Sequence, residues 1–351
     1  MKKKFRKHFL ALPLAALIAL FVFSCVYIDE ISVMQVYDGK EVSYVYAGDV
    51  ATFTINGHIE CHEDHQSVNF VAAFLVPKAW KVAENGKATY KSSLADDRDM
   101  EKPMSVIPAS SLPKNGGGLT WVECLTQTYG VGPNVLDDME WVVYQTDEKW
   151  DIINNQFPSY TIYLRTPVGD QNLKCHIGFF VNHTDDGFSG GNDHKKCMFS
   201  NECFEVVGGK GAVLDFCNNH YNKVAPMSSL QNDYVTFSFI GDVADNDLSS
   251  TGEVYFEAEA VTTDGKVYKV DEKTEKTLMK RTGAYSGTYT KTLWPVGFFG
   301  LGEDEQIQQI HYSFTNKDRS IVITQSDDDF AQHGTELPAE KVPFTFAFSC
   351  D

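Results

Sequence analysis

The sequence is short of basic residues. Its 351 residues contain 30 Lys and Arg against 48 Asp and Glu, which gives a formal net charge of −18. Phosphate backbones and anionic lipid surfaces repel such an acidic chain. We therefore expect no nucleic-acid partner.

Motifs that carry chemistry are also missing. The sequence has no nucleophile elbow, no phosphate-binding glycine loop and no zinc-protease helix. A carboxylate pair for glycoside hydrolysis meets in space and not in sequence order, so a hydrolase stays open as an alternative without support from any motif. We expect a protein that is not an enzyme and that has no cofactor and no metal.

Long apolar runs and helical periodicity are missing beyond residue 24. No later apolar run reaches the roughly 20 residues that a membrane-spanning helix needs. Without a 3.6-residue period, we expect β structure nearly throughout this part of the chain. Runs of β-branched and aromatic residues alternate with turn signals such as Asp38-Gly39 and Asn56-Gly57, which predicts strands. The expected fold class is all-β, with two immunoglobulin-like β-sandwich domains in tandem.

The strand pattern also suggests the domain limits. Between residues 77 and 135 the rhythm breaks at several prolines and at a run of three glycines, which predicts a long loop insertion. A second irregular stretch covers residues 184–201, and residues 218–230, with Pro226 and two serines, are the expected linker, so we place the boundary near Pro226. Residues 31–225 then form the first sandwich with its insertion, and residues 226–351 form the second.

The N-terminus carries an export signal. A basic segment is followed by an apolar run from Phe9 to Phe23 and by Ser24-Cys25, the pattern of a secretory signal. The stretch 22–25 (VFSC) resembles a bacterial lipobox, in which the cysteine receives the lipid. We expect residues 1–24 to be a signal peptide, Cys25 to be lipidated and residues 25–30 to form a lipid-anchored tether. The alternative is an uncleaved membrane anchor.

Seven more cysteines follow Cys25. Because seven is odd, at least one stays free even where pairs oxidise. The three between Cys197 and Cys217 are the best disulfide candidates, with the pairing left open. The seven are Cys61, Cys124, Cys175, Cys197, Cys203, Cys217 and Cys350.

Three polar clusters contain possible cation ligands. Residues 61–65 (CHEDH) have zinc-ligand types without the usual zinc spacing. The aspartates of 242–247 and of 327–329 lack the order of a calcium loop. We favour solvated loops for all three and expect no metal.

Aromatic residues are the remaining lead. A sugar ring stacks its apolar face on Trp or Tyr while polar neighbours bond its hydroxyls. Trp141 lies within a strand and Trp294 ends one, so we expect both in the core. Aromatics in or beside irregular segments are our candidates for exposed carbohydrate-binding platforms: Trp80, Trp121, Tyr129 and Trp150.

Two stretches of the first domain, 74–80 (FLVPKAW) and 137–141 (DDMEW), resemble an uncharacterised, DUF4961-like family of Bacteroidetes surface lipoproteins. The acidic pair Asp29-Glu30 after the lipobox resembles the same group. In the second domain, 293–300 (LWPVGFFG) and 310–318 (IHYSFTNKD) resemble β-sandwich modules that flank amylases and starch-binding lipoproteins. Those modules usually continue with Asp-Gly-Ser, where this chain has Asp-Arg-Ser.

The resemblance implies a domain of unknown function that occurs with starch-utilisation-like uptake systems. From it we expect an outer-membrane lipoprotein, facing the cell exterior, that captures a polysaccharide or oligosaccharide. Its expected partners are a TonB-dependent transporter and companion lipoproteins. The alternative is a structural or adhesive surface lipoprotein that acts through protein partners. Exposed, coplanar aromatic rings favour the first reading and their burial the second; two carboxyls about 5 to 9 Å apart in a cleft favour a hydrolase.

Overall fold

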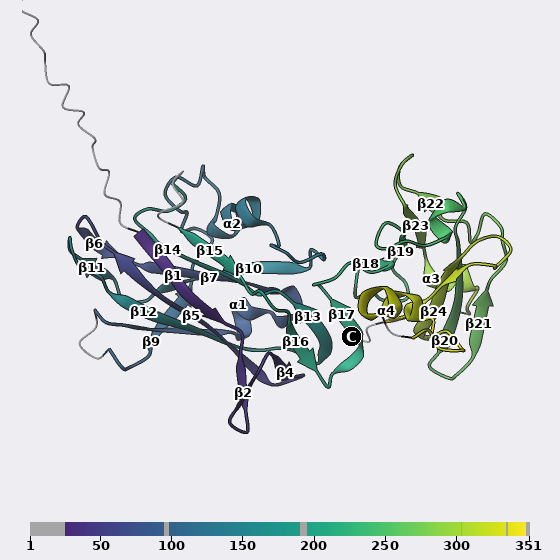
Figure 1. The fold of residues 1–351 in the computed structure, drawn as a ribbon, viewed down its shortest axis with the longest axis horizontal. Helices are drawn as coiled ribbons and strands as arrows, with labels where there is room; N and C mark the ends of the chain where they lie inside the picture. Colours follow the sequence, from purple (N-terminus) through teal and green to yellow (C-terminus); the bar gives the residue numbers. More distant parts are fainter. Residues whose placement is uncertain (1–24, 95–97, 190–194, 303, 335, 349–351) are drawn as a thin grey trace, which may run out of the picture.

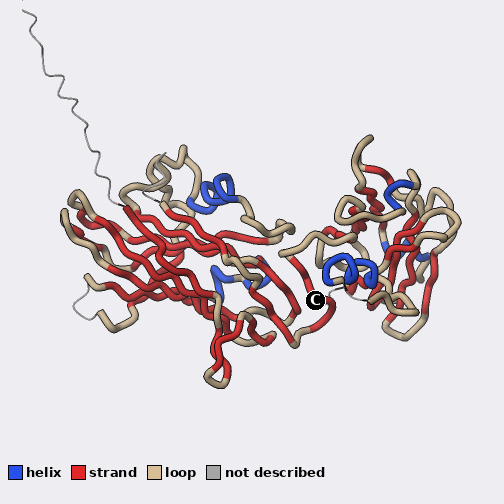
Figure 2. Tube along the Cα trace, viewed as in Figure 1, coloured by secondary structure: helices blue, strands red, loops and turns tan. Residues whose placement is uncertain are grey.

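The computed structural model describes residues 25–94, 98–189, 195–302, 304–334 and 336–348. The predicted signal peptide and Cys350 lie outside these residues. Strands dominate the described chain, as Figure 2 shows in red. Two hydrophobic cores occupy separate parts of the chain, one reaching from Val26 to Phe216 and the other from Tyr221 to Phe346. The predicted all-β fold with tandem sandwiches is confirmed.

A nine-stranded antiparallel sheet forms the first sandwich. In spatial order its strands are β1 (Cys25–Ser32), β5 (Val50–Glu60), β12 (Ser159–Pro167), β8 (Lys87–Ser92), β9 (Lys102–Val106), β10 (Met139–Thr146), β7 (Phe70–Pro77), β14 (Gly178–His183) and β15 (Lys196–Phe199). β9 pairs with both β8 and β10 and turns the corner between the two layers. The sheet curls until its first strand contacts its last two (Figure 1). One sheet therefore makes both layers of the sandwich.

Strand β5 illustrates why this sequence folds as it does. Its residues alternate between buried and partly exposed along nearly its whole length, which is the two-residue period of a half-buried strand. Ala51, Phe53 and Ile55 face the core. The predicted turn at Asn56-Gly57 is wrong, because both residues continue the strand. Gly57 has no room for a side chain: a Cβ there would lie 2.3 Å from the Tyr160 hydroxyl.

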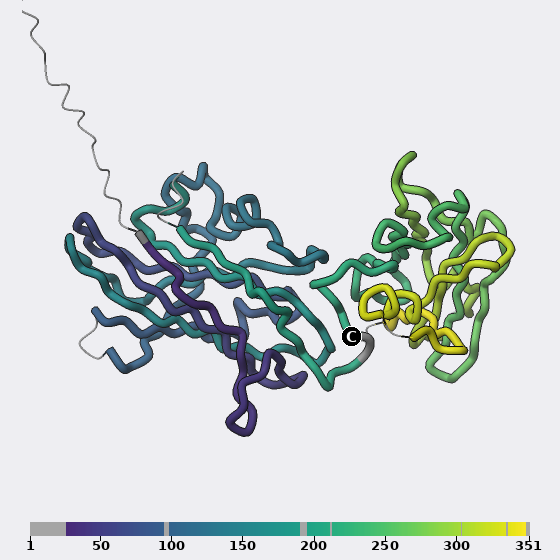
Figure 3. The backbone as a smooth tube through the Cα atoms, in the orientation of Figure 1, coloured from purple at the N-terminus to yellow at the C-terminus, as the bar shows by residue number. Residues whose placement is uncertain are grey.

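Smaller elements complete the first sandwich. A mixed four-stranded sheet contains β17 (Lys210–Asp215), β13 (Gln171–Cys175), β16 (Phe204–Val207) and β4 (Tyr44–Tyr46). Two ribbons pair β6 (His65–Val68) with β11 (Trp150–Ile152) and β2 (Gln35–Tyr37) with β3 (Lys40–Val42). The β2–β3 hairpin projects from the body of the sandwich (Figure 3). Its predicted turn at Asp38-Gly39 is confirmed, with a positive φ at both residues.

The second sandwich has two sheets. One contains β18 (Asn222–Ala225), β19 (Val235–Ile240), β23 (Thr288–Leu293) and β22 (Lys280–Arg281). The other contains β21 (Val267–Val270), β20 (Tyr255–Thr262), β24 (Ile307–Thr315), β25 (Val322–Ile323) and β26 (Phe344–Ala347). Aromatic rings from both sheets fill the space between them; Phe237 contacts Phe256 and Tyr312 at ring-centroid distances of 4.7 and 4.9 Å. These contacts stabilise the second core.

Short helices occur between the strands, although the sequence shows no helical period beyond residue 24. They are η1 (Lys78–Trp80), α1 (Val82–Asn85), α2 (Trp121–Tyr129), η2 (Leu248–Ser250), α3 (Pro295–Phe299) and α4 (Gln325–His333). The longest have nine residues, which is too short for a periodic pattern to stand out in the sequence. Within the described residues no helix has the length and apolar character to cross a membrane.

Three predicted limits change. Residues 25–30, expected to be a tether, belong to β1, which pairs with β5 from Cys25 onward. The expected insertion at 77–135 contains β8 and β9, so two strands of the main sheet lie inside it. The second sandwich begins before the boundary at Pro226, because β18 pairs with β19.

Candidate functional site

The aromatic residues predicted as exposed platforms are buried or partly buried. Trp80, Trp121 and Trp150 are 2, 3 and 7% exposed, and Tyr129 packs partly buried against the first core. The prediction of exposure is therefore wrong for the three tryptophans. Trp141 lies in the core as predicted, whereas Trp294, also predicted there, is 44% exposed.

Tertiary packing explains this burial. Trp80 stacks on Phe53 and Trp150 stacks on Phe70, with ring centroids 6.1 and 5.3 Å apart. The Trp150 Nε1–H donates to the Tyr90 hydroxyl at 3.4 Å. Trp80 and Trp150, which the sequence places in or beside irregular segments, thus contribute large rings to the first core.

Residues 120–135 cover the outer face of the sheet instead of presenting a platform. Helix α2 packs on β10, and the Trp141 Nε1–H donates to the Gly130 carbonyl at 2.9 Å. Tyr129 contacts Trp141 and Phe180, and burial raises the pKa of Tyr129 to about 12. These residues thus pack on β10 and β14, the two strands that flank β7, and every residue of β7 is buried.

Trp80 also borders a cavity that is partly open to the surface. The cavity has a volume of about 240 Å³, and Asp138, Asp170 and Gln171 are among its lining residues. Within the described residues the Trp80 Nε1–H has no hydrogen-bond partner. With so little of the ring exposed, Trp80 has no open face on which a sugar could stack.

A different set of aromatics lies at the surface, on and beside the β2–β3 hairpin. We call this set the hairpin surface. The Tyr37 ring is nearly parallel to the Tyr44 ring at 6.1 Å and meets the Tyr46 ring edge-on at 5.3 Å. Tyr46 is 48% exposed and Val36 is 68% exposed. The members of the surface are Met34, Val36, Tyr37, Tyr44, Tyr46 and Val50.

The hairpin surface borders a groove of about 450 Å³. Its lining residues are Met34, Gln35, Val36, Tyr37, Asp49, Val50 and Thr52. The volume falls in the range of small-molecule sites, and the mixture of apolar residues with a few polar groups is typical of them. The groove can therefore take a ligand with an apolar face and hydroxyl groups.

Hydrogen bonds fix the shape of this groove. The Tyr37 hydroxyl donates to Asp49 Oδ2 at 3.1 Å and accepts from the Tyr46 amide at 3.3 Å. The buried Gln35 side chain bonds both the amide and the carbonyl of Thr52, at 2.9 and 2.8 Å. The hairpin is thus tied to β5. The tyrosines of the hairpin surface were not among the predicted platforms, because those were aromatics in or beside irregular segments. The alternation Tyr44-Val45-Tyr46 is the sequence signal for them, since it places two rings on one face of a strand.

Within the described residues, the cluster at residues 61–65 does not bring three ligand atoms together. His65 is 4% exposed and lies with its ring centroid 4.9 Å from that of His183, while His62 faces Glu60. His65 Nδ1 lies 3.1 Å from Asp185 Oδ2. The Lys114 ammonium bonded to Asp185 lowers the pKa of that carboxyl.

The aspartate clusters have structural partners. Asp242 Oδ2 accepts from the Gly287 amide at 2.9 Å. Asp327 caps α4 by accepting from the Thr324 amide at 2.8 Å. Asp328 is 1% exposed and accepts from the Tyr221 amide at 2.6 Å. Asp242, Asp327 and Asp328 thus each accept a hydrogen bond from a backbone amide.

His220 joins the two sandwiches. Its Nδ1 bonds Asp328 of the second sandwich, and its Nε2 lies 3.2 Å from Asp215 Oδ2 at the end of β17. Burial alone lowers the pKa of His220, but the two carboxylates outweigh it and raise that pKa to about 9. Burial likewise raises the pKa of Asp215, but hydrogen bonds from His220, Asn218 and the Cys217 amide outweigh it and lower that pKa to about 2. His220 and Asp215 are therefore both charged at neutral pH, and His220 lies between Asp215 and Asp328 as the centre of a triad.

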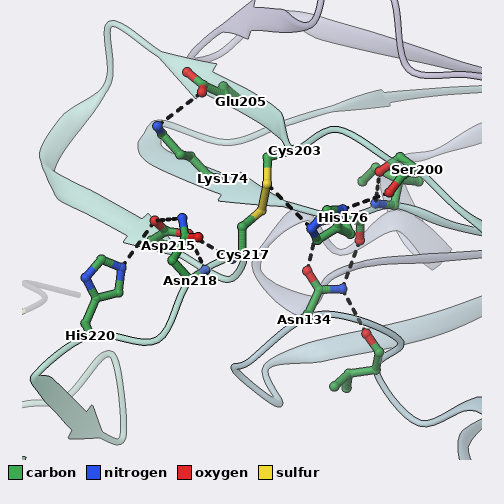
Figure 4. The surroundings of a disulfide bond; sticks show 12 residues. Asn134, Lys174, His176, Ser200, Cys203, Glu205, Asp215, Cys217, Asn218 and His220 are labelled. Carbon is green, nitrogen blue, oxygen red and sulfur yellow. Dashed lines mark hydrogen bonds and ion pairs between the residues drawn. A yellow bond between two sulfur atoms is a disulfide. The ribbon is translucent and has the colours of Figure 1, made fainter. Parts of the chain in front are cut away.

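Cys203 and Cys217 form a disulfide bond (Figure 4). Two of the three predicted candidates are thus paired, and Cys197 is a thiol. Cys124 and Cys175 are buried thiols, so the prediction that at least one cysteine stays free is confirmed. Burial raises the pKa of the Cys197 thiol to about 12, which makes it a poor nucleophile.

The chain is thus an all-β protein of two tandem sandwiches, with an exposed groove on the first. The family described as "Domain of unknown function (DUF4961)" matches residues 27–220, more than half of the chain, and the protein belongs to this family. A second, "Domain of unknown function (DUF8578)", matches residues 222–323. No curated protein matches the chain.

Three solved structures that resemble the chain do so at low identity and low TM-score. AvmM, which catalyses macrocyclization in alchivemycin A biosynthesis, is 11% identical with a TM-score of 0.26, covering 51% of this chain and 98% of its own. The C-terminal domain of the Streptococcus agalactiae AgI/II polypeptide BspA is 10% identical with a TM-score of 0.23, covering 80 and 93%. The Corynebacterium diphtheriae major pilin SpaA is 10% identical with a TM-score of 0.22, covering 85 and 60%. Such values carry no argument about function.

Proposed function

We propose that this protein is a non-catalytic, lipid-anchored binding protein of the bacterial outer surface that captures a glycan in the groove beside the hairpin surface. The groove carries the proposal. It brings the Tyr37 ring together with Asp49, Gln35 and Thr52 in an open hollow. An apolar ring face with polar groups at its rim matches the amphipathic character of a sugar.

The position of the hairpin supports this role. Cys25, the expected lipid attachment site, is the first residue of β1 and pairs with Glu60 of β5. The eight residues of β1 span about 26 Å at about 3.3 Å per residue, and the hairpin follows at the far end of β1 (Figure 1). A lipid on Cys25 would thus hold one end of the sandwich at the membrane while the hairpin surface faces away. Captured glycan would pass to a TonB-dependent transporter and its companion lipoproteins.

A second function, structural or adhesive attachment through a protein partner, rests on a different observation. Met34, Val36 and Val50 are 39, 68 and 56% exposed around the same groove. Aliphatic side chains offer little to a sugar, but they are the surface that a protein partner covers. The burial of the predicted tryptophan platforms points the same way.

Affinity electrophoresis of residues 26–351 against plant, host and microbial polysaccharides separates the two functions. We expect one glycan to retard the protein, and Tyr37→Ala combined with Tyr44→Ala to weaken that binding at least about tenfold, or about 1.4 kcal/mol. Tyr285→Ala is the matched control, because Tyr285 is fully exposed in the second sandwich.

Each other outcome has a definite meaning. Retardation that survives the double substitution would put the glycan site elsewhere and contradict the groove. Failure of every glycan to retard the protein would reject glycan capture and leave the protein-partner function.

A further inference from the structure

Three potential metal ligands meet at the end of the four-stranded sheet. The His176 Nε2, Cys203 Sγ and Cys217 Sγ atoms all lie within 4.8 Å of one another, and each residue is partly exposed. Among His, Cys, Asp and Glu in the described ranges, this is the one group of three that gathers so closely. Figure 4 shows the imidazole directed at the disulfide.

The imidazole is held in the form that binds a metal. His176 Nδ1 lies 2.8 Å from the Ser200 carbonyl oxygen. Because a carbonyl only accepts, Nδ1 carries the proton and Nε2 presents its lone pair to the sulfur atoms. Metal-bound histidines make this same outer hydrogen bond, which fixes their tautomer and orientation.

The separation of the ligand atoms fits a tetrahedral ion. With Zn–N of about 2.0–2.1 Å and Zn–S of about 2.3 Å, a tetrahedral angle separates nitrogen from sulfur by about 3.6 Å. The observed distance from His176 Nε2 to Cys203 Sγ is 3.6 Å. Two sulfurs on the same ion would lie about 3.8 Å apart. A small movement of the two cysteine side chains after reduction would bring the sulfurs to this separation and complete the three-ligand site.

The backbone holds these positions independently of the sulfur–sulfur bond. In the register of β13, Cys175 pairs with Phe204 of β16 and Lys174 pairs with Asp215 of β17. His176, Cys203 and Cys217 are each one or two residues beyond a paired position, so the sheet brings them to one end. The Asn134 side chain also accepts from the His176 amide at 2.8 Å.

We propose that this corner is a redox-controlled metal site, in which reduction of the Cys203–Cys217 disulfide by a dithiol creates a Cys₂His site for Zn²⁺ or a similar thiophilic divalent cation. One thiolate of the dithiol attacks a disulfide sulfur to give a mixed disulfide. Its second thiolate displaces the protein sulfur, and the reductant leaves as a cyclic disulfide. Protons from the medium complete the two cysteine thiols, and metal binding returns both to the solvent. Water fills the fourth position.

Cobalt is the probe, because Co²⁺ bound to thiolates absorbs visible and near-ultraviolet light. The test uses residues 26–351, which contain every member of both hydrophobic cores. The protein is reduced with dithiothreitol, desalted without oxygen and titrated with Co²⁺. We expect one Co²⁺ per reduced chain with a thiolate-to-cobalt band, no such band with the oxidised chain, and displacement by Zn²⁺.

Variants assign the ligands. Cys203→Ser combined with Cys217→Ser should remove the band, and His176→Ala should weaken Co²⁺ binding at least about tenfold, since even outer-shell changes cost 10- to 100-fold. Cys197→Ser is the control, because it removes a partly buried thiol outside the group. Equal binding by the double serine variant, or no binding by the reduced chain, overturns the proposal.

A second readout needs no variant. If reduction loosens this corner, Zn²⁺ should restore the near-ultraviolet circular dichroism and raise the Tm of the reduced chain while leaving the oxidised chain unchanged. If Zn²⁺ changes neither the near-ultraviolet circular dichroism nor the Tm of the reduced chain, the two cysteines form only a structural disulfide.

Discussion

Single aromatic residues in this protein take their roles from their neighbours in space. Trp150 lies beside an irregular segment yet stacks on Phe70 inside the first core, whereas Trp294, expected in the core, directly follows β23 and is 44% exposed. Both have the same indole ring, so the side chain alone does not decide burial. Contacts made by residues distant in the sequence do.

We predict that Trp150→Ala lowers the free energy of unfolding by about 3–5 kcal/mol, because it removes a large buried ring and leaves a cavity. Urea unfolding followed by far-ultraviolet circular dichroism measures the change. Trp294→Ala is the matched control, with an expected cost of about 1 kcal/mol or less. Equal costs for the two substitutions would mean that Trp150 is not a core residue.

At the scale of elements, two helices begin with the same local device. Thr120 accepts from the Glu123 amide at 3.2 Å while Glu123 accepts from the Thr120 amide at 2.7 Å, and Thr324 and Asp327 form the equivalent box for α4. These bonds satisfy amides that the first helical turn leaves without partners. The pattern Thr-x-x-Glu or Thr-x-x-Asp is visible in the sequence, but the helices behind it are too short to show a period.

We predict that Thr120→Ala destabilises α2 by about 1 kcal/mol, the usual cost of losing an N-cap. Hydrogen exchange of the α2 amides measures the local opening. Thr126→Ala makes the same change inside the same helix at an exposed position, where alanine is the better helix former. It should leave exchange unchanged or slow it, and comparable acceleration by both substitutions would argue against the capping role.

At the scale of the whole molecule, charge holds the two sandwiches together. His220 lies between Asp215 of the first sandwich and Asp328 of the second. The raised pKa of His220, about 9 against an ordinary 6.5, stabilises the folded chain fully below pH 6.5, and this contribution is lost as the pH rises through 9. The lowered pKa of Asp215, about 2 against 3.8, contributes above pH 3.8 and is lost as the pH falls through 2. The window for both contributions is therefore about pH 4 to 6.5.

We predict that Asp328→Asn costs roughly 2–5 kcal/mol within this window, the range for removing one charge of a buried, hydrogen-bonded pair. Thermal unfolding of wild type and variant from pH 4 to 10 checks it. The difference in Tm should shrink as the pH passes 9, when His220 loses its charge in the wild type. Asp329→Asn is the control, because Asp329 is the next residue and is exposed, and it should change the Tm little at any pH. A Tm difference between wild type and Asp328→Asn that does not vary with pH would contradict the role of the triad.

The sequence by itself determined the strand character of this protein. Alternating β-branched and aromatic residues and the Asp38-Gly39 turn are local signals, so the all-β class and the tandem sandwiches followed from them. Cysteine spacing likewise narrowed the disulfide to three residues, two of which are bonded.

Only the tertiary structure decided the site. Whether Trp80 or Tyr46 is exposed depends on which distant strands cover it: Trp80 packs against Phe53 of β5 and Phe204 of β16, whereas Tyr46 stays 48% exposed. The disulfide partner, the imidazole beside it and the carboxylates around His220 come together through pairing between β13, β16 and β17 and through contact between the sandwiches. Sequence spacing does not predict these contacts. They form when long loops of chain close, and the residues that then meet carry no local signal of their partners.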